Sequence, residues 1–209
     1  MTVQTRPSPT SAETRLVSLI TADEYRLLPE TNKICELING EIVMAPAPRM
    51  THQLVVGNLY ELVQSFLRRE QLGFAFAAPF DVFLNTYEVY QPDIVVVLRE
   101  HSDLLTEEGF VGMPGVVVEV LSPSNRRNDL VTKAAEYAAG GVPEYWVVDP
   151  AIDRIEINRL QRGVYLPIVS TDGIARSVAL PGFEVTPADI FAMPAWMTRP
   201  TSSTVPEEG

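Results

Sequence analysis

Apolar residues recur along this chain with two different periods, and these periods divide it into predicted helices and strands. Within residues 51–72, large apolar side chains recur every three or four positions, which predicts a long amphipathic helix lying against a sheet. Continuous β-branched runs at residues 94–98 and 116–121 are typical of central strands that are covered on both faces. A further inner strand is predicted over residues 142–148. The pattern therefore predicts a sheet with a buried centre.

Turn and cap residues mark the boundaries of the N-terminal elements. Asn39-Gly40 stands between two short β-rich runs and predicts a hairpin, because both central positions of a type I′ turn need a positive φ. Thr21 and Glu24 match a capping box, which predicts a short helix just before Pro29.

A second helix is predicted over residues 129–139, and a pair of glycines follows it as a C-terminal cap requires. Lys133 and Tyr137 share one face of this helix, one turn apart. The neighbouring face carries small and apolar side chains and is the expected core stripe: Leu130, Ala134 and Ala138.

The remaining segments predict shorter elements. Residues 73–84 suggest one bent or interrupted strand, and residues 100–112 an acidic loop. An antiparallel pair is expected at 154–159 and 163–169, an edge strand at 174–180 and a short helix at 187–191. Together the elements predict an α/β (α+β) fold: a central mixed sheet flanked by helices, with an N-terminal hairpin and C-terminal antiparallel strands.

Length and composition are those of one folded domain. The chain has 209 residues, of which 46% are hydrophobic and 21% charged. Proline, serine and threonine dominate the first residues, so we expect a mobile arm at 1–15, a single domain at 16–195 and a tail at 196–209.

Cellular context is constrained by what the chain lacks. Its apolar runs fall far short of the roughly 20 residues that a spanning helix needs, and its N-terminus has no apolar signal core. Cys35 is the single cysteine, which excludes an intramolecular disulfide and a cysteine-based zinc cluster. A cytoplasmic protein with no membrane partner is expected.

The net charge of −11 disfavours a general nucleic-acid coat protein, because phosphate binding depends on lysine and arginine. It does not exclude a nuclease whose central acids are compensated by a metal ion. The basic residues close to the candidate site are Arg126, Arg127 and Lys133.

Two carboxylates lie beside or within apolar strands, where burial of a charge costs free energy. Asp93 immediately precedes one valine-rich strand, and Glu119 interrupts the other. If the strands are neighbours and both side chains share a face, the carboxylates lie about 5 Å apart. With the Val120 carbonyl and water, they would suit Mg²⁺ or Mn²⁺. Lys133 follows after a short connection and could orient or deprotonate a water, or neutralise developing charge.

The order of Pro92-Asp93, Glu119 and Lys133 resembles that of the PD-(D/E)xK, restriction-endonuclease-like nuclease superfamily. More closely, the stretches ELINGEIV, QPDIVVV, PGVVVEVLSPSN and DLVTKAAEYAAGGVPEYWVVDP are similar to the Uma-type putative restriction endonuclease family, over roughly residues 30–160. Leu121 departs from the superfamily, which places a lysine two residues after the glutamate. The resemblance to the Uma-type family implies that Lys133 supplies this lysine from the following helix.

This resemblance implies a restriction-endonuclease-like core and a Mg²⁺- or Mn²⁺-dependent endonuclease acting on DNA. Its site residues would be Asp93, Glu119 and Lys133, with Glu41 and His52 as accessory residues. A homodimer is a further expectation, because cleavage of a duplex often needs two sites.

Each of these residues also has a purely structural interpretation. Asp93 could cap a strand, Glu119 could pair with Arg126 or Arg127, and Lys133 could lie on the surface. Glu36 and Glu41 could be solvent-facing strand residues. Two alternative functions also stay open: a catalytically inactive nucleic-acid or protein interaction module on the same fold, and a hydrolase of small phosphoesters.

Overall fold

The computed structural model describes residues 19–197, apart from residues 30, 32 and 124–125. The predicted arm at residues 1–15 lies outside the described residues, as does most of the predicted tail. Within the described part of the chain, no helix is long and apolar enough to cross a membrane.

The main sheet has six strands in the order β12-β11-β10-β9-β6-β3. They are β3 (Gly73–Ala77), β6 (Ile94–Leu98), β9 (Val116–Val120), β10 (Glu144–Asp149), β11 (Arg154–Gln161) and β12 (Val164–Pro167). The β9–β10 pair is parallel and the other pairs are antiparallel, so the sheet is mixed as expected. Nearly every residue of β6, β9 and β10 is buried, which confirms the central strands predicted from continuous apolar runs.

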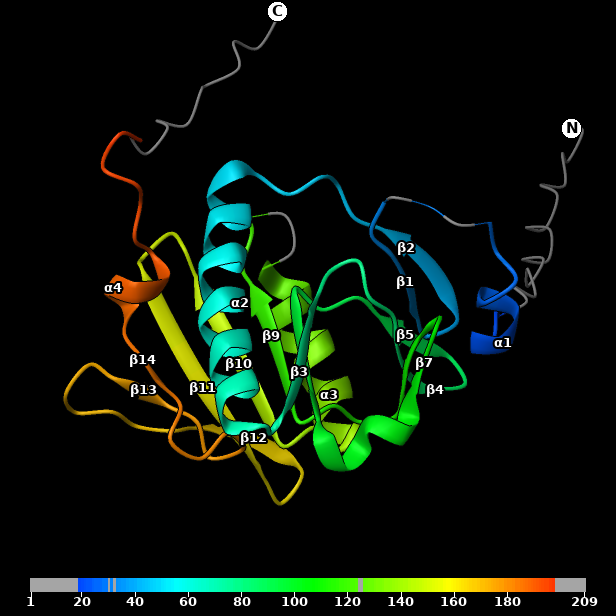
Figure 1. Ribbon diagram of the computed structural model, residues 1–209. Helices are drawn as coiled ribbons and strands as arrows, with labels where there is room; N and C mark the ends of the chain where they lie inside the picture. Colours follow the sequence, from blue (N-terminus) through cyan, green and yellow to red (C-terminus); the bar gives the residue numbers. More distant parts are fainter. Residues whose placement is uncertain (1–18, 30, 32, 124–125, 198–209) are drawn as a thin grey trace, which may run out of the picture.

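One face of this sheet is covered by α2 (Met50–Glu70), drawn in cyan in Figure 1. Val55, Leu59 and Val63 of α2 are almost fully buried in a cluster that also holds alternate residues of the central strands. The short helix α4 (Pro187–Ile190) packs beside α2, with Ile190 in the same cluster. The long predicted helix is confirmed within two residues at each end.

The opposite face meets a helix that begins as a π-helical segment, η2 (Asn128–Lys133), and continues as α3 (Ala134–Gly140). The predicted core stripe is wrong at Leu130, which is 42% exposed, whereas Ala134 packs against the core and Lys133 is 5% exposed. The buried side chains are instead Asp129, Lys133 and Tyr137. Lys133 and Tyr137 donate to the side chain of Glu119, which points to the same side of β9, and the Tyr137 ring also packs with Val117 and Leu121, so ion pairing accompanies apolar packing on this face.

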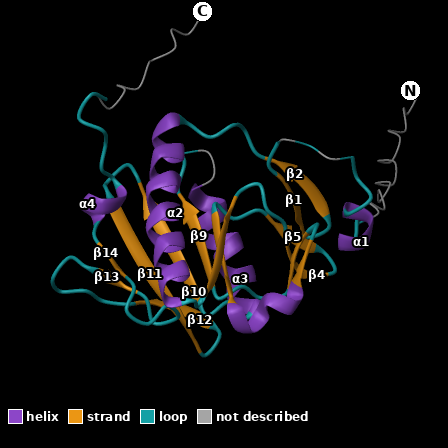
Figure 2. Ribbon diagram, in the orientation of Figure 1, coloured by secondary structure: helices purple, strands orange, loops and turns teal. Residues whose placement is uncertain are grey.

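A second six-stranded sheet, visible on the right of Figure 2, has the order β2-β1-β5-β4-β8-β7. Its strands are β1 (Cys35–Ile38), β2 (Glu41–Met44), β4 (Val82–Asn85), β5 (Glu88–Tyr90), β7 (Leu105–Thr106) and β8 (Gly109–Val111). The hairpin of β1 and β2 is confirmed, with φ of 51° at Asn39 and 74° at Gly40. The capping box of Thr21 and Glu24 is also confirmed, at the start of α1 (Ala22–Tyr25).

Three predicted segments differ in the structure. Residues 73–84 form two strands, β3 and β4, that belong to different sheets. The predicted acidic loop contains η1 (Arg99–Leu104), β7 and β8. The expected edge strand at 174–180 shrinks to β13 (Ala175–Arg176), which pairs with β14 (Glu184–Val185). The first outcome depends on partners that a local pattern does not specify, since β3 pairs with β6 and β4 pairs with β8.

Glu144, at the start of β10, anchors the C-terminal segment to the main sheet. It is 1% exposed, and its carboxylate accepts hydrogen bonds from Trp146 Nε1, Ser177 Oγ and the backbone N–H groups of Val178 and Ala179. A buried carboxylate that accepts four hydrogen bonds fixes the chain that surrounds it.

We expect Glu144→Ala to lower the free energy of unfolding by about 3 kcal/mol, because buried donors then lose their acceptor. Urea unfolding followed by circular dichroism measures this loss. The exposed Glu184→Ala is the control and should change stability by less than about 0.5 kcal/mol. Equal stability of both variants would contradict the anchoring role.

Candidate active site

The centre of the site is an ion-paired cluster on the α3 side of the main sheet. Lys133 Nζ donates to Glu119 Oε1 at 3.0 Å, and the hydroxyl of Tyr137 donates to the same oxygen at 2.9 Å. Lys133 and Glu119 are 5% and 4% exposed. The π-helical turn and α3 bring the two side chains of this helix onto β9, since Lys133 and Tyr137 lie one turn apart. Glu119 therefore pairs with Lys133 and not with Arg126, which pairs with Asp149 at 2.6 Å.

A second carboxylate, Glu36 of β1, holds the same ammonium. Lys133 Nζ lies 2.8 Å from Glu36 Oε1, and Glu36 is 5% exposed. Sequence reasoning left this residue as an ambiguous strand glutamate. A usable signal was nonetheless present, because Glu36 stands between Cys35 and Leu37 as Glu119 stands among valines.

Gln91 connects the two sheets at this point. Its backbone N–H donates to Glu36 Oε1 at 3.0 Å, and its side chain accepts from Cys35 N and donates to Asp81 Oδ1. Because Gln91 is two residues before Asp93, these bonds set the position of Glu36 relative to the start of β6. The Asp81 carboxyl has a raised pKa because of burial, and Gln91 and Tyr25 hydrogen bonds partly oppose this rise.

Asp93 lies at the start of β6, next to β9 as predicted. Ile94 pairs with Val118, which places Asp93 beside Glu119 across the antiparallel pair. Asp93 Oδ2 accepts a hydrogen bond from Val120 N at 2.7 Å and lies 3.2 Å from His52 Nε2. His52 comes from the first turn of α2, so three elements converge on this carboxylate.

The structure does not bring Glu41 to the cluster. Glu41 is exposed and pairs with Ile38 at the turn end of the hairpin, whereas Glu36 pairs with Val43 further along. The two glutamates share one face of the hairpin, but only Glu36 lines the cavity described below.

Burial and neighbouring charges have opposite effects on the pKa of Lys133. Burial alone would lower its pKa, but the charges of Glu119, Glu36 and Asp129 outweigh burial and raise the pKa of Lys133. Burial raises the pKa of Glu119 well above its usual range, with Lys133 as the main opposing influence. Lys133 is therefore a fixed positive charge at neutral pH and not a proton acceptor.

His52 shows a similar balance. Burial lowers its pKa, but the hydrogen bond to Asp93, the charge of Asp93 and the nearby Val120 carbonyl together raise it. His52 Nδ1 is nevertheless buried without a hydrogen-bond partner within the described part of the chain. The raised pKa favours the protonated imidazolium, which donates to Asp93.

Ionisation of Asp129 is expected to make the free energy of unfolding depend on pH. Burial raises its pKa from 3.8 to about 6, with Lys133 opposing the rise. Because the folded-state pKa lies above the unfolded one, the native state becomes less stable as pH rises from about 4 to 6, and the penalty persists above that. The interval corresponds to about 3 kcal/mol at about 1.36 kcal/mol per pKa unit.

We therefore expect Asp129→Asn to be more stable than the parent protein at pH 7 in metal-free buffer, by up to about 3 kcal/mol. The difference should disappear near pH 4, where both carry a neutral side chain. Thermal unfolding at pH 4, 5.5 and 7 in the presence of EDTA measures it. A pH-independent difference would show that packing, not ionisation, is responsible.

Six of the titratable side chains described above line a cavity of about 700 Å³: Glu36, His52, Asp93, Glu119, Asp129 and Lys133. Four carboxylates, those of Glu36, Asp93, Glu119 and Asp129, face one lysine at its floor. Oxygen donors with surplus negative charge fit a hard divalent cation. No group of three His, Cys, Asp or Glu side chains is placed to hold a metal among the described residues, so such an ion would also need backbone oxygen or water ligands.

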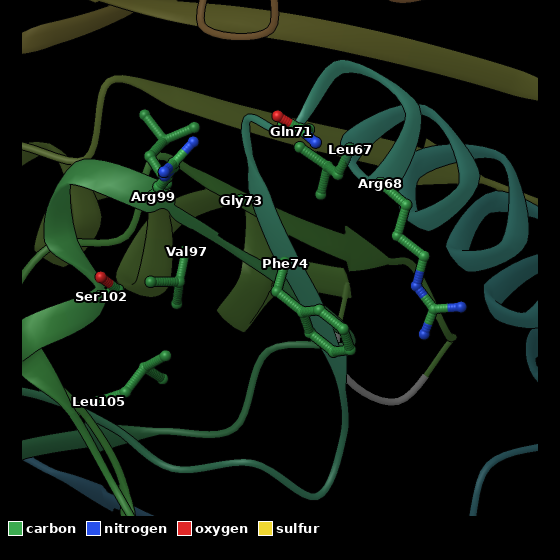
Figure 3. Close-up of a pocket in the computed structure, with 10 residues that line it drawn as sticks. Leu67, Arg68, Gln71, Gly73, Phe74, Val97, Arg99, Ser102 and Leu105 are labelled. Atoms are coloured by element: carbon green, nitrogen blue, oxygen red, sulfur yellow. The ribbon is translucent and has the colours of Figure 1, made fainter.

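A second cavity of about 460 Å³ lies at the far end of β6, near Leu98 (Figure 3). Arg68, Phe74 and Arg99 line it, and Figure 3 shows the two arginines on different sides of it. Its described lining contains no carboxylate. It therefore lacks the acid and lysine chemistry of the first cavity.

Comparison with known proteins gives the family and the fold of the chain. The family model of Uma2, described as putative restriction endonuclease, matches residues 22–188. Among solved structures, a putative nuclease of DUF820 from Anabaena variabilis ATCC 29413 superposes with a TM-score of 0.70. It shares 20% sequence identity and the match covers 82% of this chain and 97% of that one, which shows a common fold. No curated protein matches the chain.

The family match spans both sheets and every residue of the ion-paired cluster. The predicted resemblance is thereby confirmed. This chain belongs to the Uma2 family of putative restriction endonucleases.

Proposed function

We propose that this protein is a divalent-metal-dependent endonuclease that hydrolyses phosphodiester bonds in DNA. The observation that carries the proposal is the buried Lys133 ammonium, held between Glu36 and Glu119 at the floor of a cavity that Asp93 also lines. Surplus carboxylates around one fixed cation are costly for folding and are typical of catalytic sites. Membership of a family described as restriction endonucleases supports the same reaction class.

In this proposal Asp93, Glu119 and the Val120 carbonyl hold Mg²⁺ or Mn²⁺. A bound divalent cation supplies Lewis-acid chemistry, offsetting negative charge on phosphoryl oxygens. The chain orients the ligands: Val120 N–H holds Asp93 in place, and the Tyr137 hydroxyl holds Glu119.

Lys133 acts as a charge stabiliser. Its raised pKa keeps the ammonium protonated, so it donates to developing phosphate charge and does not deprotonate the attacking water. The oxygen of water adds to phosphorus, the bond from phosphorus to the leaving sugar oxygen breaks, and the water proton ends on that oxygen. His52, donating to Asp93, is an accessory residue that orients this carboxylate.

Glu36 and Glu41 provide a matched pair for testing the assignment. Glu36→Gln removes a carboxylate that holds Lys133 at 2.8 Å, and we expect the cleavage rate to fall about 100-fold. Glu41→Gln, on the exposed end of the same hairpin, should cleave within about twofold of the parent. Initial rates at saturating Mn²⁺ measure both. A larger loss in Glu41→Gln than in Glu36→Gln would restore Glu41 as the accessory acid.

A hydrolase of small phosphoesters is the second candidate. The cavity volume of about 700 Å³ lies within the range of pockets that enclose one small molecule. The net charge of −11 also weakens long-range attraction of polyanions.

The deciding experiment incubates the purified protein with supercoiled plasmid, single-stranded circular DNA and bis(p-nitrophenyl) phosphate, each with Mg²⁺, Mn²⁺ or EDTA. Metal-dependent cleavage of either DNA supports the endonuclease. Turnover of the small diester alone favours the second candidate. No turnover and no Mn²⁺ binding would favour an inactive interaction module on the same fold.

Two further expectations stay predictions: residues 16–195 as a single domain, and a homodimer. Limited proteolysis tests the first, since cleavage should fall outside this range. Light scattering of the eluting protein tests the second.

A further inference from the structure

The catalytic floor of the cavity is deeply covered. Glu36, Glu119 and Lys133 are 5%, 4% and 5% exposed. One wall is the segment that joins β2 to α2, which includes Pro46, Pro48 and Arg49, and which crosses the top of Figure 1. Residues 121–123 and 150–151 form further parts of the wall. A phosphate must therefore pass these wall segments before it reaches the buried lysine.

Continuous duplex DNA fits this shape poorly. Its phosphates lie on the outside of a stiff cylinder whose minor groove alone is about 6 Å wide, so they meet only groups close to a protein surface. A cavity of about 700 Å³ has the size of a small-molecule pocket and not of a groove for a double helix. An unpaired strand can enter an enclosed cavity without the unpairing and unstacking cost that a duplex would incur.

The walls also suggest how a strand is held. The described lining has no phenylalanine, tyrosine or tryptophan, so bases find no large aromatic platform. The proline and alanine side chains of the lining offer no hydrogen bonds for base recognition, the Gln91 amide bonds to Cys35 and Asp81, and Thr51 and Ser122 contribute two hydroxyl groups. Arg49, an exposed cation at the start of α2 for which the described residues provide no ion pair, lines the rim and is suited to a backbone phosphate.

We infer that the substrate is an unpaired DNA strand, which threads one or two nucleotides past these wall segments with Arg49 on a flanking phosphate. The inference rests on the proposed endonuclease function. Because the contacts are to backbone and to apolar surface, cleavage is tolerant of sequence. Single-stranded regions such as flaps, gaps and supercoil-induced openings are then cut, whereas relaxed intact duplex is spared.

The test compares four substrates with Mn²⁺: a single-stranded 30-mer, the same sequence as blunt duplex, a duplex bearing a single-stranded flap, and relaxed covalently closed plasmid. We expect the single strand and the flap to be cut at least tenfold faster than the blunt duplex, and the relaxed plasmid to stay intact. Equal or faster cleavage of the blunt duplex would overturn the inference while supporting the endonuclease function.

A DNA-binding measurement tests the preference for single strands independently of cleavage. If no DNA is cut, the endonuclease proposal fails, and fluorescence anisotropy with Asp93→Asn still decides the substrate form. Tighter binding of the single-stranded 30-mer than of the duplex supports the inference, and equal or tighter duplex binding contradicts it.

A matched arginine pair tests the rim contact. Arg49→Ala should weaken single-strand binding about fivefold and reduce the salt slope by about 0.7, the value for one phosphate contact. Arg99→Ala, in the second cavity at the far end of β6, should leave both quantities unchanged. Equal effects of the two substitutions would show non-specific charge attraction and remove Arg49 from the path.

Discussion

Replacing Lys133 by methionine is expected to abolish detectable DNA cleavage and to lower the free energy of unfolding by about 3–5 kcal/mol. The ammonium lies 2.8 Å from Glu36, 3.0 Å from Glu119 and 3.7 Å from Asp129. Methionine keeps the apolar stem but leaves these carboxylates buried without a counter-charge. Part of the loss will be relieved as one or more of them takes up a proton.

The stability loss and the chemical loss can be separated with a second substitution. Lys133→Met combined with Glu119→Gln removes one positive and one negative charge, so we expect about half or more of the lost stability to return. Cleavage should not return, because the charge that stabilises the phosphate is still absent. Urea unfolding and plasmid nicking at 100-fold excess enzyme measure the two quantities.

Lys33→Met is the control, because Lys33 is exposed on the approach to β1. It should change the free energy of unfolding by less than about 0.5 kcal/mol and the cleavage rate by less than about twofold. Full activity of Lys133→Met would exclude this lysine from the reaction and leave the buried cluster with a role in stability alone.

Asp93→Asn is expected to reduce cleavage by at least about 1000-fold while changing stability by less than about 1 kcal/mol. The asparagine oxygen can still accept the hydrogen bond that Val120 N donates to Asp93 Oδ2 at 2.7 Å, so the local backbone should remain in place. The lost negative charge, however, removes a proposed ligand of Mg²⁺ or Mn²⁺. Neutralising one of four neighbouring carboxylates also relieves repulsion, which offsets any weakening of the hydrogen bond.

Isothermal titration with Mn²⁺ and cleavage assays over a range of Mn²⁺ concentrations test this expectation together. Reduced Mn²⁺ affinity with a matching loss of rate supports the ligand role of Asp93. The exposed Asp103→Asn, in η1 near the other end of β6, is the control and should bind Mn²⁺ as the parent does. Unchanged Mn²⁺ affinity in Asp93→Asn would move the metal site away from this residue.

The contrast between these two substitutions reflects different structural roles. Lys133 is the centre of a buried charge cluster, so its removal affects both folding and chemistry. Asp93 lies at the cavity wall beside His52, and in the proposed function its charge serves metal binding more than packing. Sites that combine both roles are expected to trade stability for function, as Asp129 also illustrates.

Periodicity and turn chemistry were sufficient for most elements. The apolar spacing over residues 51–72 specifies α2, and the unbroken valine runs specify β6 and β9, because a helix stripe and a doubly covered strand each have a distinct local pattern. Asn39-Gly40 similarly specifies the hairpin of β1 and β2.

The same local patterns misassigned the face that η2 and α3 bury. Leu130 and Ala134 have the composition of a core stripe, whereas the structure buries Lys133 and Tyr137. Hydrophobicity predicts a buried face only when the opposing surface is apolar. Here the opposing surface carries Glu119, so a charged face is the complementary one.

By itself the sequence determined the principal helices and strands, and it identified Asp93 and Glu119 as acids at the edge and inside of apolar strands, because burial makes charge conspicuous in a local pattern. Only the tertiary structure decided that Glu36, 97 positions from Lys133, completes the cluster and that Glu41 does not. Chain topology and register set which distant carboxylate meets an ammonium, and neither is encoded in the spacing of nearby residues.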